Sequence, residues 1–270
     1  MGPMADRYTH GHHESVLRSH RWRTAENSAP HLLPHLEAGQ RVLDVGCGPG
    51  TITLDLARAV APGPVVGIDA APDAIDAAIA ARDEAGLSDA VTLSVGDVYA
   101  LDAPDDAFDV VHAHQVLQHL TDPVAALREM RRVVAPGGLV AVRESDYGAF
   151  VWAPDDPVLD RWLALYHQVT RTNRADADAG RHLPGWFHAA GFTDVEVGSS
   201  NWTFADPDDR AWWGGLWADR VVSSAFAGQA LEYNLAEGDE LQEMAAAFRR
   251  WADADDGVFV VVHVEVLARP

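Results

Sequence analysis

The most informative stretch of this chain is Val42-Leu43-Asp44-Val45-Gly46-Cys47-Gly48-Pro49-Gly50-Thr51. It predicts a short buried strand that enters a glycine-rich turn and then begins a helix. Glycine allows positive φ angles and lets the backbone come close to a ligand. The start of the helix supplies unpaired N–H groups and the positive end of the helix dipole, which suit a polar or anionic ligand group. Such a turn by itself is also found in dinucleotide enzymes and in purely structural loops.

Short apolar runs alternate with helical runs from residue 41 onward, which is typical of βαβ units on a parallel sheet with right-handed crossovers. The strands are predicted at 41–46, 65–69, 91–95, 108–114 and 138–144, and the helices near 50–60, 72–86 and 122–135. Asp122 as a capping residue and Pro123 in the first turn predict where the last of these helices begins. With 195–204 and 258–267 as the final strands, we expect a Rossmann-like α/β fold: a doubly wound, mostly parallel seven-stranded sheet with helices on both faces.

The composition changes beyond residue 145, where eight of the nine tryptophans lie. Helical patterns occupy 156–173, 180–190, 206–226 and 238–252. We therefore expect a main domain at 41–270 that carries a helical cap insertion at about 205–256. Residues 1–40 are predicted to form a helical lead-in, or lid. Its histidines are interpreted as solvated helix surface and not as a metal site, because no acidic cluster completes a coordination shell: His10, His12, His13, His20, His31 and His35.

Length and composition favour one soluble globular domain. A chain of 270 residues with 48% hydrophobic residues can bury one large core. No run approaches eighteen apolar residues, and the polar start lacks the layout of a secretory signal, so we expect a cytoplasmic protein without a membrane partner. The lone cysteine, Cys47, can form neither an internal disulfide nor a thiolate zinc cage by itself.

The charge pattern excludes several function classes. The net charge is −21, and all the basic residues are arginines because the chain has no lysine. Such an acidic surface repels phosphate backbones and anionic lipids, which weighs against a nucleic-acid partner. The absence of lysine excludes Schiff-base catalysis and a P-loop lysine. Arginine in place of lysine, together with abundant alanine, suggests a GC-rich bacterial genome.

Two carboxylates follow the second and third predicted strands. Asp69 ends Val65-Val66-Gly67-Ile68-Asp69, where a carboxylate can accept hydrogen bonds from both hydroxyls of a ribose. Asp97 lies in Val95-Gly96-Asp97-Val98, where it can accept from an adenine amino group. Either acid alone could be a helix cap or a solvated turn. Because parallel strands end along one edge of a sheet, we expect both acids to meet the glycine turn at a single ligand site.

These residues resemble the class I S-adenosylmethionine-dependent methyltransferases, and among them the menaquinone and ubiquinone C-methyltransferases. The resemblance covers about residues 40–145 and rests on five ordered motifs: residues 44–50, Gly67-Ile68-Asp69, Gly96-Asp97-Val98, Phe108-Asp109-Val110-Val111, and Arg132-Val133-Val134-Ala135-Pro136-Gly137-Gly138. It implies that the glycines border the methionine part of S-adenosylmethionine, that Asp69 holds the ribose, and that Asp97 and Val98 contact the adenine. His114 would lie beside the sulfonium and its methyl. The implied cofactor-binding residues are Asp44, Gly46, Cys47, Gly48, Gly50, Asp69, Ala70, Gly96, Asp97, Val98 and His114.

Methyl transfer from a sulfonium is an in-line displacement, so positioning can supply much of the acceleration and a dedicated base is optional. If the nucleophile carries a removable proton, His114 and His119 are the candidate catalytic residues, because imidazole titrates near neutrality. His119 could equally be a packing residue, and His112 could simply be buried. Residues 144–147 face the same edge of the predicted sheet and could orient the substrate or only close a turn.

The lead-in and the insertion are the expected lid over the substrate. The candidate substrate-binding residues are Tyr8, Trp22, Arg23, Tyr147 and Trp213. Trp212, Trp213 and Trp217 have helical spacing, which is also typical of a helix face that packs into a core. Aromatic residues concentrated in a cap favour a small, apolar or aromatic acceptor that is methylated on carbon, oxygen or nitrogen.

Two other functions fit parts of the sequence. A protein of the same fold could bind S-adenosylmethionine without transferring its methyl, as a cyclase would. A nicotinamide-dependent oxidoreductase shares the strand, turn and ribose acid. The glycines here follow G-x-G-x-G and not the dinucleotide pattern G-x-G-x-x-G, which disfavours the oxidoreductase. We expect a monomer or a homodimer.

Overall fold

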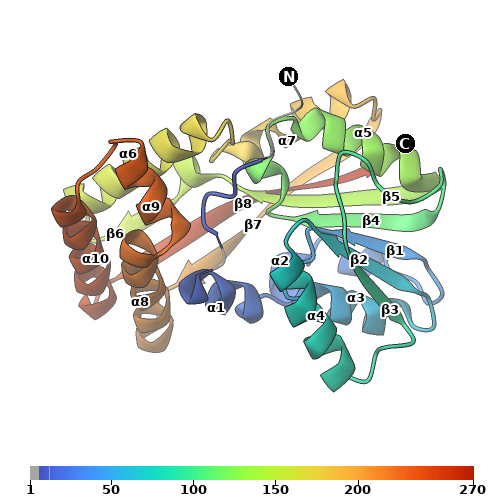
Figure 1. The fold of residues 1–270 in the computed structure, drawn as a ribbon, viewed down its shortest axis with the longest axis horizontal. Helices are drawn as coiled ribbons and strands as arrows, with labels where there is room; N and C mark the ends of the chain where they lie inside the picture. Colours follow the sequence, from blue (N-terminus) through green and yellow to red (C-terminus); the bar gives the residue numbers. More distant parts are fainter. Residues whose placement is uncertain (1–5, 12) are drawn as a thin grey trace.

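The structure is a computed structural model and describes residues 6–11 and 13–270. Five parallel strands form one half of its sheet, in the order β3-β2-β1-β4-β5. They are β1 (Val42–Val45), β2 (Val65–Asp69), β3 (Val91–Val95), β4 (Phe108–His114) and β5 (Val134–Ser145). The three connecting helices are α3 (Thr51–Val60), α4 (Pro72–Glu84) and α5 (Pro123–Val133). This half confirms the predicted Rossmann-like order of strands and helices (Figure 1).

The other half of the sheet is antiparallel. The closing strand β8 (Val258–Arg269) pairs with β5, and β7 (Asp194–Phe204) pairs with β8 along its length. A short strand, β6 (Val151–Ala153), joins β8 beyond the end of β5. Within residues 6–11 and 13–270 the sheet therefore has eight strands, so the prediction of seven is wrong, and the additional strand is β6. Three residues are too few to show the alternation from which a strand is predicted.

Helices cover both faces of the parallel half. On one face, α3 and the short α2 (Ala25–Ser28) pack against apolar side chains of β1, β2 and β4. On the other, α5 and α7 (Ala179–Ala189) pack against β4 and β5. The carboxylate of Asp122 accepts a hydrogen bond from the Ala125 N–H at 2.9 Å, and Pro123 is the first helical residue, so the predicted start of α5 is confirmed. Strand β5 begins four residues before its predicted start at 138, because the chain enters it through an irregular pairing with β4.

Helices from the second half of the chain gather beside the antiparallel half of the sheet (Figure 1). Helices α8 (Pro207–Ser223), α9 (Ala225–Glu232) and α10 (Gly238–Asp253) lie between β7 and β8 in the chain, at the predicted insertion. They share an aromatic core with α6 (Pro157–Thr172), which precedes β7, and Trp162, Trp217 and Phe248 lie at its centre. The pattern 206–226 predicts one helix, but the extended backbone of Ser224 divides it into α8 and α9.

The lead-in connects the two halves of the molecule. Its helix α1 (Glu14–Trp22) contacts α8, and α2 contacts α3. Figure 1 shows α1 between α8 and the α2–α3 pair. Short 3-10 turns complete the chain at η1 (Leu33–His35), η2 (Leu117–His119) and η3 (Tyr147–Ala149). Within the described ranges, no helix combines the length and the apolar character needed to cross a membrane.

The interpretation of the lead-in histidines as solvated surface is wrong for two of them. His10 is 5% exposed and its Nε2 lies 2.9 Å from the hydroxyl of Tyr166 on α6. The side chain of His31 is 7% exposed and lies 3.6 Å from a carboxylate oxygen of Glu265 on β8. Both contacts join residues more than 150 positions apart in the chain, which local periodicity cannot reveal. His12 lies outside the described residues.

Candidate active site

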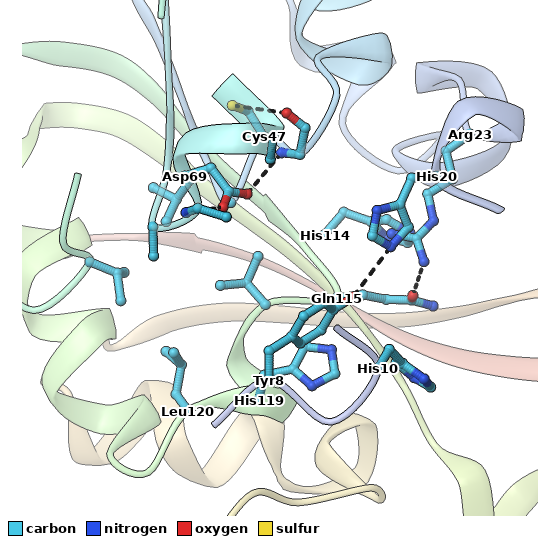
Figure 2. Close-up of a pocket in the computed structure, with 18 of the residues that line it drawn as sticks. Tyr8, His10, His20, Arg23, Cys47, Asp69, His114, Gln115, His119 and Leu120 are labelled. Atoms are coloured by element: carbon cyan, nitrogen blue, oxygen red, sulfur yellow. Dashed lines mark hydrogen bonds between the residues drawn. The ribbon is translucent and has the colours of Figure 1, made fainter. Parts of the chain in front are cut away.

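A cavity of about 1110 Å³ opens where β1, β2, β3 and β4 end and where the lead-in and α8 approach them. Binding pockets for one small molecule usually measure roughly 300–1,000 Å³, so this cavity has room for a cofactor and a small acceptor together. The glycine turn, Asp69 and Asp97 line one part of it, while Tyr147, Trp213 and Arg220 line another. Figure 2 shows the residues between these parts, with Tyr8, His114 and His119 facing the same space.

The glycine turn has the backbone geometry that its sequence predicts. Gly46, Gly48 and Gly50 have φ angles of +68°, +55° and +83°, a backbone conformation that residues other than glycine rarely adopt. A Cβ atom on Gly46 would lie 2.4 Å from Cγ2 of Val116, so glycine is also required there by close packing. A Cβ atom on Gly48 would meet nothing closer than 3.9 Å, which leaves this part of the turn open to a ligand. Gly50 caps α3 and is the one predicted turn glycine that does not line the cavity.

Asp69 is held against the glycine turn by the backbone. One carboxylate oxygen accepts a hydrogen bond from the Gly48 N–H at 3.0 Å, and the other accepts from the Ala71 N–H at 2.9 Å. The Asp69 carbonyl in turn accepts a bond from the Gly96 N–H at 3.0 Å, which ties the ends of β2 and β3 together. Asp97 accepts from the Tyr99 N–H at 2.9 Å. The turn and both acids therefore line one cavity, beside Ala70, Gly96 and Val98.

Asp44 differs from these acids because it is buried and both of its oxygens contact buried side chains. One lies 2.7 Å from Nδ1 of the buried His112, and the other accepts a 2.6 Å hydrogen bond from the Thr53 hydroxyl. Asp44 itself is 2% exposed, so its geometry is that of a brace beneath the glycine turn. Burial raises the pKa of the Cys47 thiol, which keeps it protonated and unreactive.

Gln115 is a central site residue that sequence reasoning missed. It follows β4 with a φ of +54°, which is uncommon outside glycine and often marks a functional constraint. Its side-chain amide donates to the Ser145 hydroxyl at 2.6 Å. Its carbonyl oxygen accepts from the guanidinium of Arg23 at 2.5 Å, as Figure 2 shows. Its position directly after His114, at the end of a central strand, is the signal that could have found it.

Both candidate catalytic histidines line the cavity, but burial changes their chemistry. Desolvation, reinforced by the positive charge of Arg23, lowers the pKa of His119 to about 3 and the pKa of His114 well below its usual value. The prediction that these imidazoles titrate near neutrality is therefore wrong. Both side chains are neutral at physiological pH, and each can accept a hydrogen bond but binds a proton weakly.

The part of the cavity away from the glycine turn is aromatic. Tyr8 and Tyr147, from the lead-in and η3, line it together with Trp213 of α8. Burial raises the pKa of Tyr8 to about 12 and also raises that of Tyr147, so both hydroxyls stay protonated and can donate. Trp213 also stacks on Phe204 with ring centroids 4.3 Å apart, so it belongs to the aromatic core and to the cavity wall at once.

Trp22 is the predicted substrate residue that the structure places outside the cavity lining. Its ring packs against Trp202 and Trp212 at centroid distances of 5.1 and 5.2 Å, so it joins the lead-in to β7 and α8. The other four predicted substrate residues, Tyr8, Arg23, Tyr147 and Trp213, do line the cavity. Besides Gln115, the cavity-lining residues missed from the sequence include His10, His20, Trp202, Trp217 and Arg220.

Comparison with known proteins agrees with this geometry. A family model described as a methyltransferase domain matches residues 36–203. The chain is 33% identical, over 96% of its length, to an uncharacterized methyltransferase of Schizosaccharomyces pombe, of which it covers 95%. The chain belongs to the class I S-adenosylmethionine-dependent methyltransferases. This assignment also overturns the nicotinamide-dependent oxidoreductase that the strand, turn and ribose acid left open.

Two further likenesses agree with this family and with its fold. Over 47% of its length it is 35% identical to the demethylmenaquinone methyltransferase of Staphylococcus aureus, covering 50% of that protein, in agreement with the resemblance to quinone enzymes. The solved structure of the [4+2]-cyclase SpnF has the same fold, with a TM-score of 0.56 and 24% identity, and the match covers 100% of this chain and 89% of the cyclase.

Proposed function

We propose that this methyltransferase transfers the methyl group of S-adenosylmethionine to a small, apolar or aromatic metabolite. The observation that carries the proposal is the shared cavity, in which the glycine turn and two carboxylates face an aromatic wall. When bound, S-adenosylmethionine supplies an electrophilic methyl on a sulfonium. The accepting atom could be carbon, oxygen or nitrogen.

The residues present fit the cofactor. Because each oxygen of Asp69 accepts one backbone N–H, the carboxylate is fixed in place and each oxygen keeps lone pairs for a ribose hydroxyl. The open turn at Gly48 and the N-terminus of α3 suit the polar methionine end. Asp97, together with Gly96 and Val98, would contact the adenine, while Asp44 would support the turn from below.

The acceptor would lie against Tyr8, Tyr147 and Trp213. We propose that the lead-in 1–40 and the insertion at about 205–256 form a lid on the methyltransferase domain 41–270. Two contacts between α1 and α8 support this arrangement: Arg18 pairs with Asp219 at 2.9 Å, and Arg220 donates to the Ser19 hydroxyl at 2.9 Å. A closed lid excludes water and holds the acceptor in line with the methyl.

His114 and His119 would position the acceptor and accept its hydrogen bonds. The ring of His119 packs edge to face against Tyr8 at a centroid distance of 4.7 Å, so both residues bound the same region. As neutral, weakly basic imidazoles they favour a nucleophile that needs no strong base, or one whose proton leaves after methyl transfer. Positioning would then supply most of the acceleration.

A cyclase or another non-methylating protein of this fold is the alternative, and the membership of the methyltransferase family supports it less well. The test is incubation of the protein with methyl-labelled S-adenosylmethionine and a metabolite extract, followed by mass spectrometry. A labelled product that requires Asp69 supports methyl transfer. A substrate that changes without gaining label, while the cofactor is recovered intact, would favour the alternative.

A further inference from the structure

Carboxylates and guanidinium groups both line the cavity. Five carboxylates line the part near the glycine turn and the loops after β3 and β4, and each accepts a hydrogen bond from the protein: Asp6, Asp44, Asp69, Asp97 and Asp122. The arginines that line the cavity, Arg23 and Arg220, approach it from the lead-in and from α8. The chain has a net charge of −21, so guanidinium groups placed beside aromatic rings in this cavity indicate a local role for positive charge.

Arg220 is a buried cation that has no counter-ion among the described residues. It is 5% exposed, and within this part of the chain its guanidinium donates to two neutral acceptors: the Ser15 carbonyl at 3.2 Å and the Ser19 hydroxyl at 2.9 Å. Its Nε has no hydrogen-bond partner, and no carboxylate of the described chain forms an ion pair with it. An unpaired buried charge is costly, so such a group usually serves a ligand or a conformational purpose.

The surroundings of Arg220 fit an organic anion with an apolar frame. Its guanidinium lies 4.7 Å from the ring of Trp217, which also lines the cavity and offers a flat apolar surface. The hydroxyls of Tyr8 and Tyr147 line the same cavity and remain protonated, because burial raises the pKa of both. Burial also lowers the pKa of Arg220, and a bound anion would offset that penalty.

We propose that the acceptor carries a carboxylate on an apolar or aromatic frame, and that Arg220 is the residue that binds this carboxylate. The inference rests on the proposed methyltransferase function and narrows its substrate class to hydrophobic organic acids. Guanidinium groups pair with carboxylates through two parallel hydrogen bonds, so binding at Arg220 also orients the rest of the acceptor.

Arg23 lies nearer the end of β4, where it donates to Gln115, and could instead serve the carboxylate of the cofactor's own methionine group. Arg220 also has a purely structural alternative, because its bonds to Ser15 and Ser19 brace α8 against α1. The test must therefore distinguish binding of an acceptor carboxylate from binding of the cofactor's carboxylate. It must also distinguish the loss of the Arg220 charge from the loss of its structural bonds to α1. Arg18 offers a matched control, since its 2.9 Å ion pair with Asp219 also joins α1 to α8 and does not line the cavity.

The experiment compares 2-naphthoate with its neutral isostere 2-naphthamide, each titrated by calorimetry with and without S-adenosylhomocysteine. The wild-type protein should bind the carboxylate at least tenfold more tightly than the amide, which is the usual magnitude for one charged hydrogen-bonded pair. Arg220→Gln should bring the ratio of the two affinities near one. Arg220→Lys should keep part of the preference, and Arg18→Gln should keep all of it.

A ratio near one in the wild-type protein, or a full preference retained by Arg220→Gln, would overturn the proposal. So would a preference lost in Arg23→Gln and kept in Arg220→Gln, because the carboxylate would then bind at Arg23. The ratio is independent of any general loosening of the lid, since both probes have the same shape. Binding of S-adenosylhomocysteine, measured in the same series, tests the methyltransferase function separately from the acceptor's charge.

Discussion

Removing the carboxylate of Asp69 should weaken cofactor binding by about a hundredfold. The two oxygens each accept one backbone N–H, at 3.0 and 2.9 Å, and each keeps a lone pair that can accept a further hydrogen bond. A hydrogen bond to a charged group contributes about 1.5–3 kcal/mol, so two bonds to a ribose, partly replaced by water, are worth about 3 kcal/mol. At 25 °C this free energy corresponds to roughly a hundredfold in Kd. The variant is Asp69→Ala.

The assay is calorimetric titration with S-adenosylhomocysteine, accompanied by urea unfolding of the same variant. The unfolding measurement is needed because Asp69→Ala also removes the acceptor of the Gly48 and Ala71 N–H groups and so weakens the turn. Asp73→Ala is the matched control, because Asp73 is an exposed acid in the first turn of α4 and does not line the cavity. The control should bind within twofold of wild type. A folded Asp69→Ala protein that binds within threefold of wild type would refute the ribose assignment.

Three other substitutions test separate features of the fold. Gly46→Ala places a Cβ 2.4 Å from Val116 at a φ of +68°, so it should lower the free energy of unfolding by about 1–3 kcal/mol. Adding Val116→Ala should restore part of this free energy, because it removes the clashing side chain. No recovery in the double variant would show that the loss comes from the backbone conformation alone. Burial raises the pKa of Glu144 from 4.5 to about 8, so between these pH values the folded protein holds a proton that the unfolded chain releases. The free energy of unfolding should therefore fall as pH rises through this window, by at most about 1.4 kcal/mol per pH unit. Urea unfolding of Glu144→Gln at pH 5.5, 7 and 8.5 should lack this slope, and a slope equal to that of wild type would show that another group causes it. Trp22→Leu should lower the free energy of unfolding by about 1–3 kcal/mol and leave the binding of S-adenosylhomocysteine unchanged, because the Trp22 ring packs outside the cavity. A selective loss of acceptor binding would instead support the predicted substrate role of Trp22.

The parallel half of the fold could be predicted because its signals are local. Residues 42–51 contain a strand, a glycine turn and the start of a helix in succession. The acids at the ends of the next two strands must lie at the same edge of the sheet, because parallel strands all end there. Strand β6 could not be predicted, since it exists only through its pairing with β8 more than 100 residues later. The antiparallel half therefore depends on contacts that no local window contains.

The same distinction applies to the site. Gly48 and Asp69 are adjacent in the cavity because of strand order, which the sequence pattern contains. Arg220 reaches Ser15 and Ser19 across about 200 residues, and His10 reaches Tyr166 across 156. The part of the cavity near the glycine turn was therefore predictable, while its aromatic part depends on distant contacts of the lead-in with α6 and α8. A further signal was available at Gln115, which directly follows a central strand.

Burial lowers the pKa of the arginines and of the histidines of this site, but it neutralises only the histidines, since the pKa of Arg23 still lies at about 10. The neutral forms of His114 and His119 are favoured by desolvation and by the nearby charge of Arg23, so neither is an efficient proton acceptor in the closed cavity. The same positive charge stabilises an anion and makes a nearby hydroxyl or enol more acidic. An acceptor in this cavity would therefore be activated by the electrostatic effect of the guanidinium groups and by its alignment with the methyl, because burial leaves His114 and His119 weak proton acceptors.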